Sequence, residues 1–93
     1  MTEQQIQKKI LDWLAAEKHY ARKIVTANKA GTPDILGVTS WGQGFGIEVK
    51  AAKGVVSELQ EYNLQLIRQA NGIALVAYSV ADVVTAFSQA QPK

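Results

Sequence analysis

Apolar and polar residues alternate most regularly over residues 45–52, where small or branched apolar side chains are separated by Glu48 and Lys50. A two-residue period is typical of a half-buried strand, so Glu48 and Lys50 are predicted to lie side by side on the same face. A second apolar run covers residues 35–38, and the segment between the two runs is rich in glycine. Together the two runs predict a β-hairpin.

The flanking segments carry the other predicted elements. Apolar residues recur at helical spacing over residues 2–18 and 57–71 and again after Ser79, whereas residues 20–27 and 73–78 have strand character. The predicted order is α-β-β-β-α-β-α, an α/β fold with a small mixed sheet flanked by helices. Strand 73–78 should pair in parallel with strand 45–52 through a right-handed crossover. We expect one domain over residues 1–93.

Asp34 begins the first strand of the hairpin, directly after Pro33, which restricts the approach of the chain to that strand. The length of the hairpin loop decides which face Asp34 occupies. A three-residue loop over residues 41–43 would place Asp34 opposite Lys50 and diagonal to Glu48. A two- or four-residue loop without a bulge would turn Asp34 to the other face. The sequence does not choose between these loops.

An acid on one strand, with an acid and a lysine on the next, is a costly set to place on one sheet face. Two close carboxylates repel each other unless a cation lies between them, and oxygen ligands with open water positions suit Mg²⁺ or Mn²⁺. A lysine beside the metal could stabilise charge on a phosphate or orient an attacking water. The structural alternative is that Asp34 caps a turn, while Glu48 and Lys50 form an exposed pair that contributes less than about 1 kcal/mol.

These residues carry a resemblance to a known family. The segment from Gly31 to Asp34, followed by Glu48-Val-Lys50, resembles the PD-(D/E)XK nuclease signature. The continuation through Ser57-x-x-Gln60 resembles the VRR-NUC branch of that superfamily. The similarity runs along nearly the whole chain, as in short stand-alone members found in phages, and it implies a restriction-endonuclease-like core.

The resemblance implies a Mg²⁺-dependent DNA endonuclease, in which Mn²⁺ can substitute, and it assigns roles to four residues of the hairpin. Asp34 and Glu48 would hold the metal, with the backbone carbonyl of Val49 as a third ligand. Lys50 would support the attacking hydroxide or the pentavalent transition state. No small organic cofactor is expected.

Two further polar residues have two interpretations each. Glu3 lies in the first turn of the first helix, where a carboxylate suits the helix dipole, but related nucleases often carry a first-helix glutamate in the metal shell. Gln60 completes a capping box with Ser57, and the family has a glutamine here that lies near the active site. Both functions of Gln60 hold together if its helix starts beside the metal.

Composition narrows the class of protein. Of the 93 residues, 47% are apolar and 19% are charged, which is ordinary for a globular domain. No apolar run approaches the roughly 18 residues that span a bilayer, and the polar start does not resemble a signal peptide. With no cysteine, disulfides and thiolate metal sites are excluded. We expect a cytoplasmic protein of a bacterial or phage-infected cell, without membrane partners.

Charge favours a nucleic-acid partner only weakly, because the formal net charge is +2. The candidate phosphate-binding residues gather near the predicted site and comprise Arg22, Lys23, Lys29, Lys53 and, at a helix start, Ser57. An ordinary solvated surface explains these residues equally well. The single histidine, His19, follows the first helix, where an imidazolium would interact favourably with the helix dipole.

The leading functional hypothesis is a structure-specific endonuclease that acts as a homodimer on branched DNA, above all on four-way (Holliday) junctions. The chain contains no separate DNA-reading motif, so recognition by shape is favoured over recognition of base sequence. A dimer would present two identical sites to two strands. The alternative is a non-catalytic nucleic-acid-binding module on the same fold, which would bind DNA with strong salt dependence and without Mg²⁺-dependent cleavage.

Overall fold

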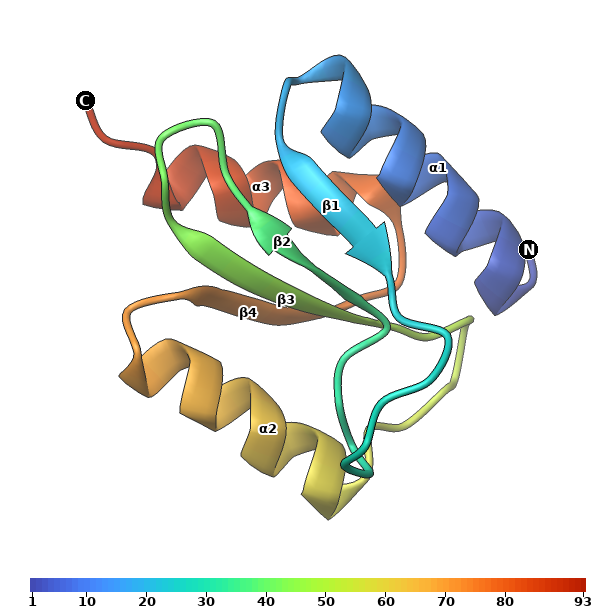
Figure 1. The fold of residues 1–93 in the computed structure, drawn as a ribbon. Helices are drawn as coiled ribbons and strands as arrows, with labels where there is room; N and C mark the ends of the chain where they lie inside the picture. Colours follow the sequence, from blue (N-terminus) through green and yellow to red (C-terminus); the bar gives the residue numbers. More distant parts are fainter.

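A four-stranded sheet runs through the middle of the molecule, which the computed structural model describes over residues 1–93 (Figure 1). Its strands, in spatial order, are β1 (Tyr20–Lys23), β2 (Ile35–Val38), β3 (Gly44–Val49) and β4 (Ile73–Ala77). The first three strands pair antiparallel, whereas β3 and β4 are parallel. The predicted mixed sheet and its parallel pair are therefore confirmed.

Three helices cover the two faces of this sheet. They are α1 (Glu3–Ala16), α2 (Glu58–Gln69) and α3 (Val80–Ala90). Helices α1 and α3 lie together on one face, and α2, which connects β3 to β4, lies alone on the other (Figure 1). The element order α-β-β-β-α-β-α matches the prediction. None of these helices has the length and apolar character that a membrane-spanning segment needs.

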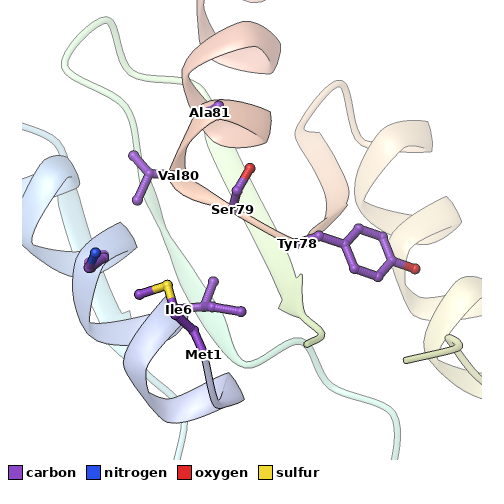
Figure 2. Close-up of a pocket in the computed structure, with 7 residues that line it drawn as sticks. Met1, Ile6, Tyr78, Ser79, Val80 and Ala81 are labelled. Atoms are coloured by element: carbon purple, nitrogen blue, oxygen red, sulfur yellow. The ribbon is translucent and has the colours of Figure 1, made fainter. Parts of the chain in front are cut away.

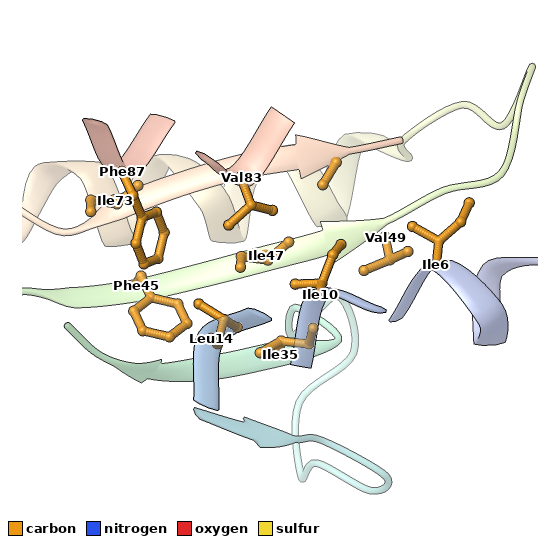
Figure 3. Packing of buried hydrophobic residues seen from close by; sticks show 11 residues of the cluster. Ile6, Ile10, Leu14, Ile35, Phe45, Ile47, Val49, Ile73, Val83 and Phe87 are labelled. Atoms are coloured by element: carbon orange, nitrogen blue, oxygen red, sulfur yellow. The ribbon is translucent and has the colours of Figure 1, made fainter. Parts of the chain in front are cut away.

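The hydrophobic core fills the space between the sheet and the α1–α3 layer (Figure 3). Alternate residues of β3 point into it, and α1 contributes one side chain per turn, two of which have no solvent exposure. The central members of this core are Ile10, Leu14, Ile35, Phe45, Ile47, Val49, Val83 and Phe87. Ile47 and Val49 point into the core. Glu48 and Lys50, which alternate with them along the chain, therefore point to the opposite face of the sheet, which α2 covers.

A glycine sets how closely α2 approaches the sheet. Gly46 faces α2, and a Cβ atom at this position would overlap the Cδ1 of Ile67. The absence of a side chain lets the helix pack directly on β3. Glu48 is the next residue of β3 on that face, so the same packing brings it beneath the start of α2.

The hairpin has a three-residue loop, one of the alternatives that the sequence left open, shifted by one residue along the chain. The β2–β3 register pairs Ile35 with Ile47, and the loop comprises residues 40–42 instead of 41–43. The Thr39 N–H donates to the Gln43 carbonyl at 2.8 Å, which closes the loop. Gly42 takes the position that requires positive φ, at +85°.

This shift changes the partner of Asp34 but not its face. Continuing the observed register by one residue places Asp34 opposite Glu48, and not opposite Lys50 as the 41–43 loop would require. Moving the loop by one residue moves the pairing by two, and a strand has a two-residue period. All three side chains therefore remain on the α2 face.

Candidate active site

Two carboxyl groups meet where β2 begins and β3 ends. The Val49 N–H donates to Oδ2 of Asp34 at 2.8 Å, so the aspartate takes the place of a backbone acceptor at the end of the β2–β3 ladder. This bond directs the Asp34 side chain toward β3. Glu48 is only 3% exposed, and its carboxyl group lies within hydrogen-bonding reach of Asp34.

The environment of Glu48 disfavours its charged form. Burial raises the pKa of Glu48 to about 8 from its ordinary value of 4.5, and the hydrogen bond and negative charge of Asp34 add to that effect. The positive charge of Lys50 lowers the pKa of Glu48 and so offsets only part of this rise, whereas the negative charge of Glu3 raises the pKa further. A buried glutamate beside a second carboxyl group, with too little positive charge nearby, is a site whose electrostatics a cation would balance.

Lys50 is held beside this pair by the loop that follows β3. Its Nζ lies 3.8 Å from Oε2 of Glu48, and its side chain is 15% exposed. The loop folds back over the lysine, so that a Cβ atom on Gly54 would lie 3.1 Å from Cβ of Lys50. The Tyr78 hydroxyl donates to the Gly54 carbonyl at 3.0 Å, which ties the loop to the end of β4.

Gln60 combines the two functions that the sequence left open. Its Oε1 accepts from the Ser57 N–H at 2.9 Å, and the Ser57 Oγ accepts from the Gln60 N–H at 3.1 Å, which completes the capping box of α2. The free Nε2 of the same amide donates to Oε2 of Glu48 at 3.1 Å. The helix start therefore faces the carboxyl pair, as the second interpretation required.

Glu3 lies near the site without completing a metal-ligand cluster. No three acidic or histidine side chains lie close enough together to hold one ion, so Asp34 and Glu48 stand as a pair in this geometry. The charge of Glu3, in the first turn of α1, still reaches Glu48. One turn further along α1, the Oε1 of Gln7 is buried and has no hydrogen-bond partner. Sequence periodicity gave no signal for Gln7.

The candidate phosphate-binding residues do not all lie on the face of the sheet that carries the carboxyl pair. Arg22 pairs with Leu36 and so shares the face of Asp34, but its guanidinium turns back over the Tyr20 ring, 4.2 Å from the centroid, and donates to the Ala21 carbonyl. Lys23 pairs with Ile35 and occupies the opposite face. Two further lysines are exposed on the loops beside the site, Lys29 before β2 and Lys53 after β3.

His19 lies at the other end of the sheet, near the hairpin loop. Its ring packs among Trp13, Trp41 and Phe87, with centroids 5.7, 5.6 and 5.0 Å away. Nδ1 accepts a hydrogen bond from the Ser40 N–H at 2.9 Å. Burial lowers the pKa of His19, an effect that Glu17 offsets only in part. His19 therefore follows the end of α1 as expected, outside the candidate site, but its ring packs against aromatic side chains in surroundings that disfavour the charged form.

The largest pocket does not contain the carboxyl pair. It has a volume of about 300 Å³ and lies between the start of α1 and the start of α3 (Figure 2). Met1, Ile6 and Val80 line it, whereas the Tyr78 ring extends away from it toward the loop that holds Lys50. The carboxyl pair lies on the opposite side of the sheet, outside any enclosed cavity.

Comparison with known proteins identifies the family. The model of the VRR-NUC domain matches residues 1–81 of this chain. The chain belongs to the VRR-NUC family. Its fold also resembles two solved structures, a VRR-NUC domain (TM-score 0.78, 21% identity) and a VRR-NUC domain protein (TM-score 0.76, 19% identity). The first likeness covers 95% of this chain and 97% of the other, and the second covers 96% and 87%. No protein with a curated description matches the sequence.

Family membership gives this VRR-NUC domain a nuclease-type fold and associates it with nucleic acid. The family match includes all of the residues that form the site, from Glu3 on α1 to Gln60 on α2.

Proposed function

We propose that this VRR-NUC domain is a Mg²⁺-dependent DNA endonuclease of the PD-(D/E)XK type. The observation that supports it most directly is the convergence of Asp34, Glu48 and Lys50 on one face of the sheet, with Glu48 buried at 3% exposure. A structural ion pair between Glu48 and Lys50 does not need a second carboxyl group beside the buried one. Burying like charges together destabilises a fold, and such arrangements are concentrated at functional sites.

The donors present fit a hard divalent cation. Asp34 and Glu48 offer carboxylate oxygens, and the Val49 carbonyl is a third candidate because the continued register places Val49 opposite Pro33, which has no N–H to donate. An all-oxygen set without histidine or cysteine suits Mg²⁺ or Mn²⁺. Bound there, the ion would supply an activated water and would neutralise charge on the scissile phosphate.

The chain's own side chains provide the rest of the chemistry. Lys50, whose Nζ lies 3.8 Å from the Glu48 carboxyl group, places a positive charge where the phosphate becomes more negative during attack. Gln60 donates to Oε2 of Glu48 and so orients the carboxyl group that would bind the ion. Val49 orients Asp34 through its N–H. Glu3 contributes long-range charge, and it would reach the metal shell only through a water or a different rotamer.

For the substrate, we infer branched DNA, with the four-way junction as the principal form, cleaved by a homodimer. The site lies where β2 begins and β3 ends, and the exposed lysines on the two adjacent loops can contact the phosphate backbone. A two-fold dimer would offer one such face to each of two strands.

A cleavage assay tests the proposal. Labelled duplex, flap, single-stranded and four-way DNA are incubated with and without Mg²⁺ or Mn²⁺. Wild-type protein is expected to cut the four-way substrate only with metal. Asp34→Asn and Glu48→Gln should abolish cutting, because each removes a charged ligand. Lys50→Ala should slow it by at least about 100-fold, because it removes a charge that stabilises the transition state.

The matched control is Lys8→Ala, which removes the same charge from an exposed position on α1, where Lys8 pairs with Asp12 at 2.8 Å. Its cleavage rate should stay within about twofold of wild type, since exposed pairs contribute little. Salt-dependent DNA binding without any metal-dependent cutting would instead establish the non-catalytic module. Full activity of Lys50→Ala would contradict the function assigned to that lysine.

A further inference from the structure

Four aromatic rings line one pocket near the hairpin loop. The pocket has a volume of about 210 Å³ and is built by residues of α1, α3, the hairpin loop and the turn after α1. Its aromatic members are Trp13, His19, Trp41 and Phe87. This aromatic pocket is separate from the carboxyl pair, which lies where β2 begins and β3 ends.

The rings of the aromatic pocket pack edge to face. Trp41 stands at 89° to His19 and at 74° to Phe87, with centroids 5.6 and 6.1 Å apart. Trp13 stands at 75° to Phe87, with centroids 5.7 Å apart. The Trp41 indole N–H donates to Oε1 of Gln43 at 2.9 Å, which fixes this ring in the loop. Because the face of an aromatic ring carries the negative part of its quadrupole, a wall of fixed rings attracts cations.

Negative charge also collects at this pocket. Glu17, the C-cap of α1, lines it, and so does Gln91, the C-cap of α3. Neither helix has a basic residue in its last turn, so the negative ends of both helix dipoles are left without a cation. Lys18 is exposed and does not line the pocket. Two helix C-termini and one carboxylate therefore meet at a pocket that no lysine or arginine lines.

The histidine of the pocket does not supply the missing positive charge. Burial lowers the pKa of His19, which disfavours the charged ring, and Nδ1 accepts a hydrogen bond from the Ser40 N–H at 2.9 Å. The negative charge of Glu17 raises the same pKa and offsets this effect only in part. The charge of Glu17 therefore acts on a group that lines the pocket, and a cation supplied from outside would balance it.

We propose that the aromatic pocket binds an alkylated ammonium group, with its methyl groups against the rings and its charge paired with Glu17. A plain ammonium is strongly hydrated, whereas an alkylated one loses less hydration and presents apolar surface to the rings. The volume suits a small head group, because pockets for drug-sized ligands start at about 300 Å³. A free quaternary amine and a methylated lysine of a partner protein both carry this group. The site is independent of the proposed nuclease activity.

Tryptophan fluorescence tests the site directly, because both tryptophans of the chain line the pocket. The protein is titrated with choline and with its uncharged isostere, the alcohol that carries a tert-butyl group in place of trimethylammonium. Choline is expected to give a saturable change, with a dissociation constant at least about tenfold lower than that of the alcohol. A titration with the amide of Nε-trimethyl-lysine separates the two sources. Tighter binding than choline indicates a protein side chain, and weaker binding indicates a free cation.

Glu17→Gln should weaken choline binding about threefold, because it removes the paired charge, and should leave binding of the alcohol unchanged. The matched control is Glu58→Gln, the same change at an exposed position in the first turn of α2, which should alter neither affinity. Both variants keep both tryptophans, and thermal unfolding checks that both keep the fold. Equal binding of choline and the alcohol, or an equal loss in the two variants, would overturn the proposal.

Discussion

At the residue scale, Glu48 shows how the site opposes the stability of the fold. Its carboxyl group is almost fully buried, beside a second carboxyl group, and only Lys50 and the Gln60 amide compensate for lost water. Burying a charge that is incompletely paired costs free energy. A residue selected for stability alone would be apolar or neutral here. This cost in stability is consistent with a chemical function of Glu48 rather than a function in folding.

The pH dependence of stability should reveal this cost. The pKa of Glu48 is raised from 4.5 to about 8 on folding, so between these values the folded state holds a proton that the unfolded state has lost. The free energy of unfolding contributed by Glu48 is therefore present below pH 4.5 and declines as pH rises toward 8. Glu48→Gln removes this titration and should be more stable than wild type at pH 8 by at least about 1 kcal/mol.

Urea unfolding of both proteins at pH 5, 6, 7 and 8 measures the difference. Because burial lowers the pKa of His19, that residue favours the opposite trend below pH 6.5 and is common to both proteins. The difference between them therefore isolates Glu48. Added Mg²⁺ should stabilise wild type at pH 8 and leave Glu48→Gln unchanged. Equal stability of the two proteins at every pH would show that Glu48 is not held in a desolvated, carboxyl-paired environment.

At the element scale, the first turn of α2 joins a folding signal to the site. The chain contains two capping boxes of the same chemistry, Thr2 with Gln5 on α1 and Ser57 with Gln60 on α2. Only the glutamine of α2 also contacts a carboxyl group, because Gly46 lets this helix pack directly on the sheet above Glu48. The same local motif thus has a structural function in one helix and a second function in the other.

The two boxes provide an internal control. Gln5→Ala and Gln60→Ala each remove one capping hydrogen bond, and both should lower the free energy of unfolding by about 1 kcal/mol. Gln60→Ala should also slow cleavage by about tenfold, since Glu48 loses the donor that holds one of its oxygens. Chemical denaturation and single-turnover cleavage measure the two effects. Equal cleavage rates for the two variants would show that Gln60 acts only as a helix cap.

At the scale of the whole molecule, both edges of the sheet are protected against strand addition. On β1, Arg22 donates to the Ala21 carbonyl at 2.8 Å, and beside β4, Arg68 donates twice to the Ala74 carbonyl, at 3.2 and 3.0 Å. Arginines that cap edge carbonyls disfavour a continuous intermolecular sheet. A second copy is therefore expected to pack against a helix. Helix α2 has exposed apolar residues along one stripe, at Leu59, Tyr62 and Leu66.

Sedimentation tests the proposed dimer. Wild type is expected to sediment as a dimer at micromolar concentration. Tyr62→Lys should shift it toward monomer, because it places a charge in the apolar stripe of α2, and should reduce paired cleavage of both strands of a four-way junction. Lys18→Glu, an exposed change at the end of α1, should not alter the assembly. A monomeric wild type at all concentrations would remove the basis for symmetric cleavage.

Local patterns in the sequence determined the order of the elements, the helix caps at Ser57 and Ser79, and the placement of Glu48 and Lys50 on one face. These features depend on hydrophobic period and on hydrogen bonds between residues a few positions apart, so they can be inferred from neighbouring residues alone. The family resemblance added the connection between Asp34 and this pair.

Only the tertiary structure decided the hairpin register, which places Asp34 opposite Glu48, and the burial that raises the pKa of Glu48. It also decided that Arg22 turns away from the site and that the His19 ring packs among aromatic side chains. These properties depend on which distant elements meet: the closure of one turn sets a register, and desolvation follows from the packing of α2 on the sheet. Hydrophobic period alone cannot determine them, because it describes each element without its neighbours.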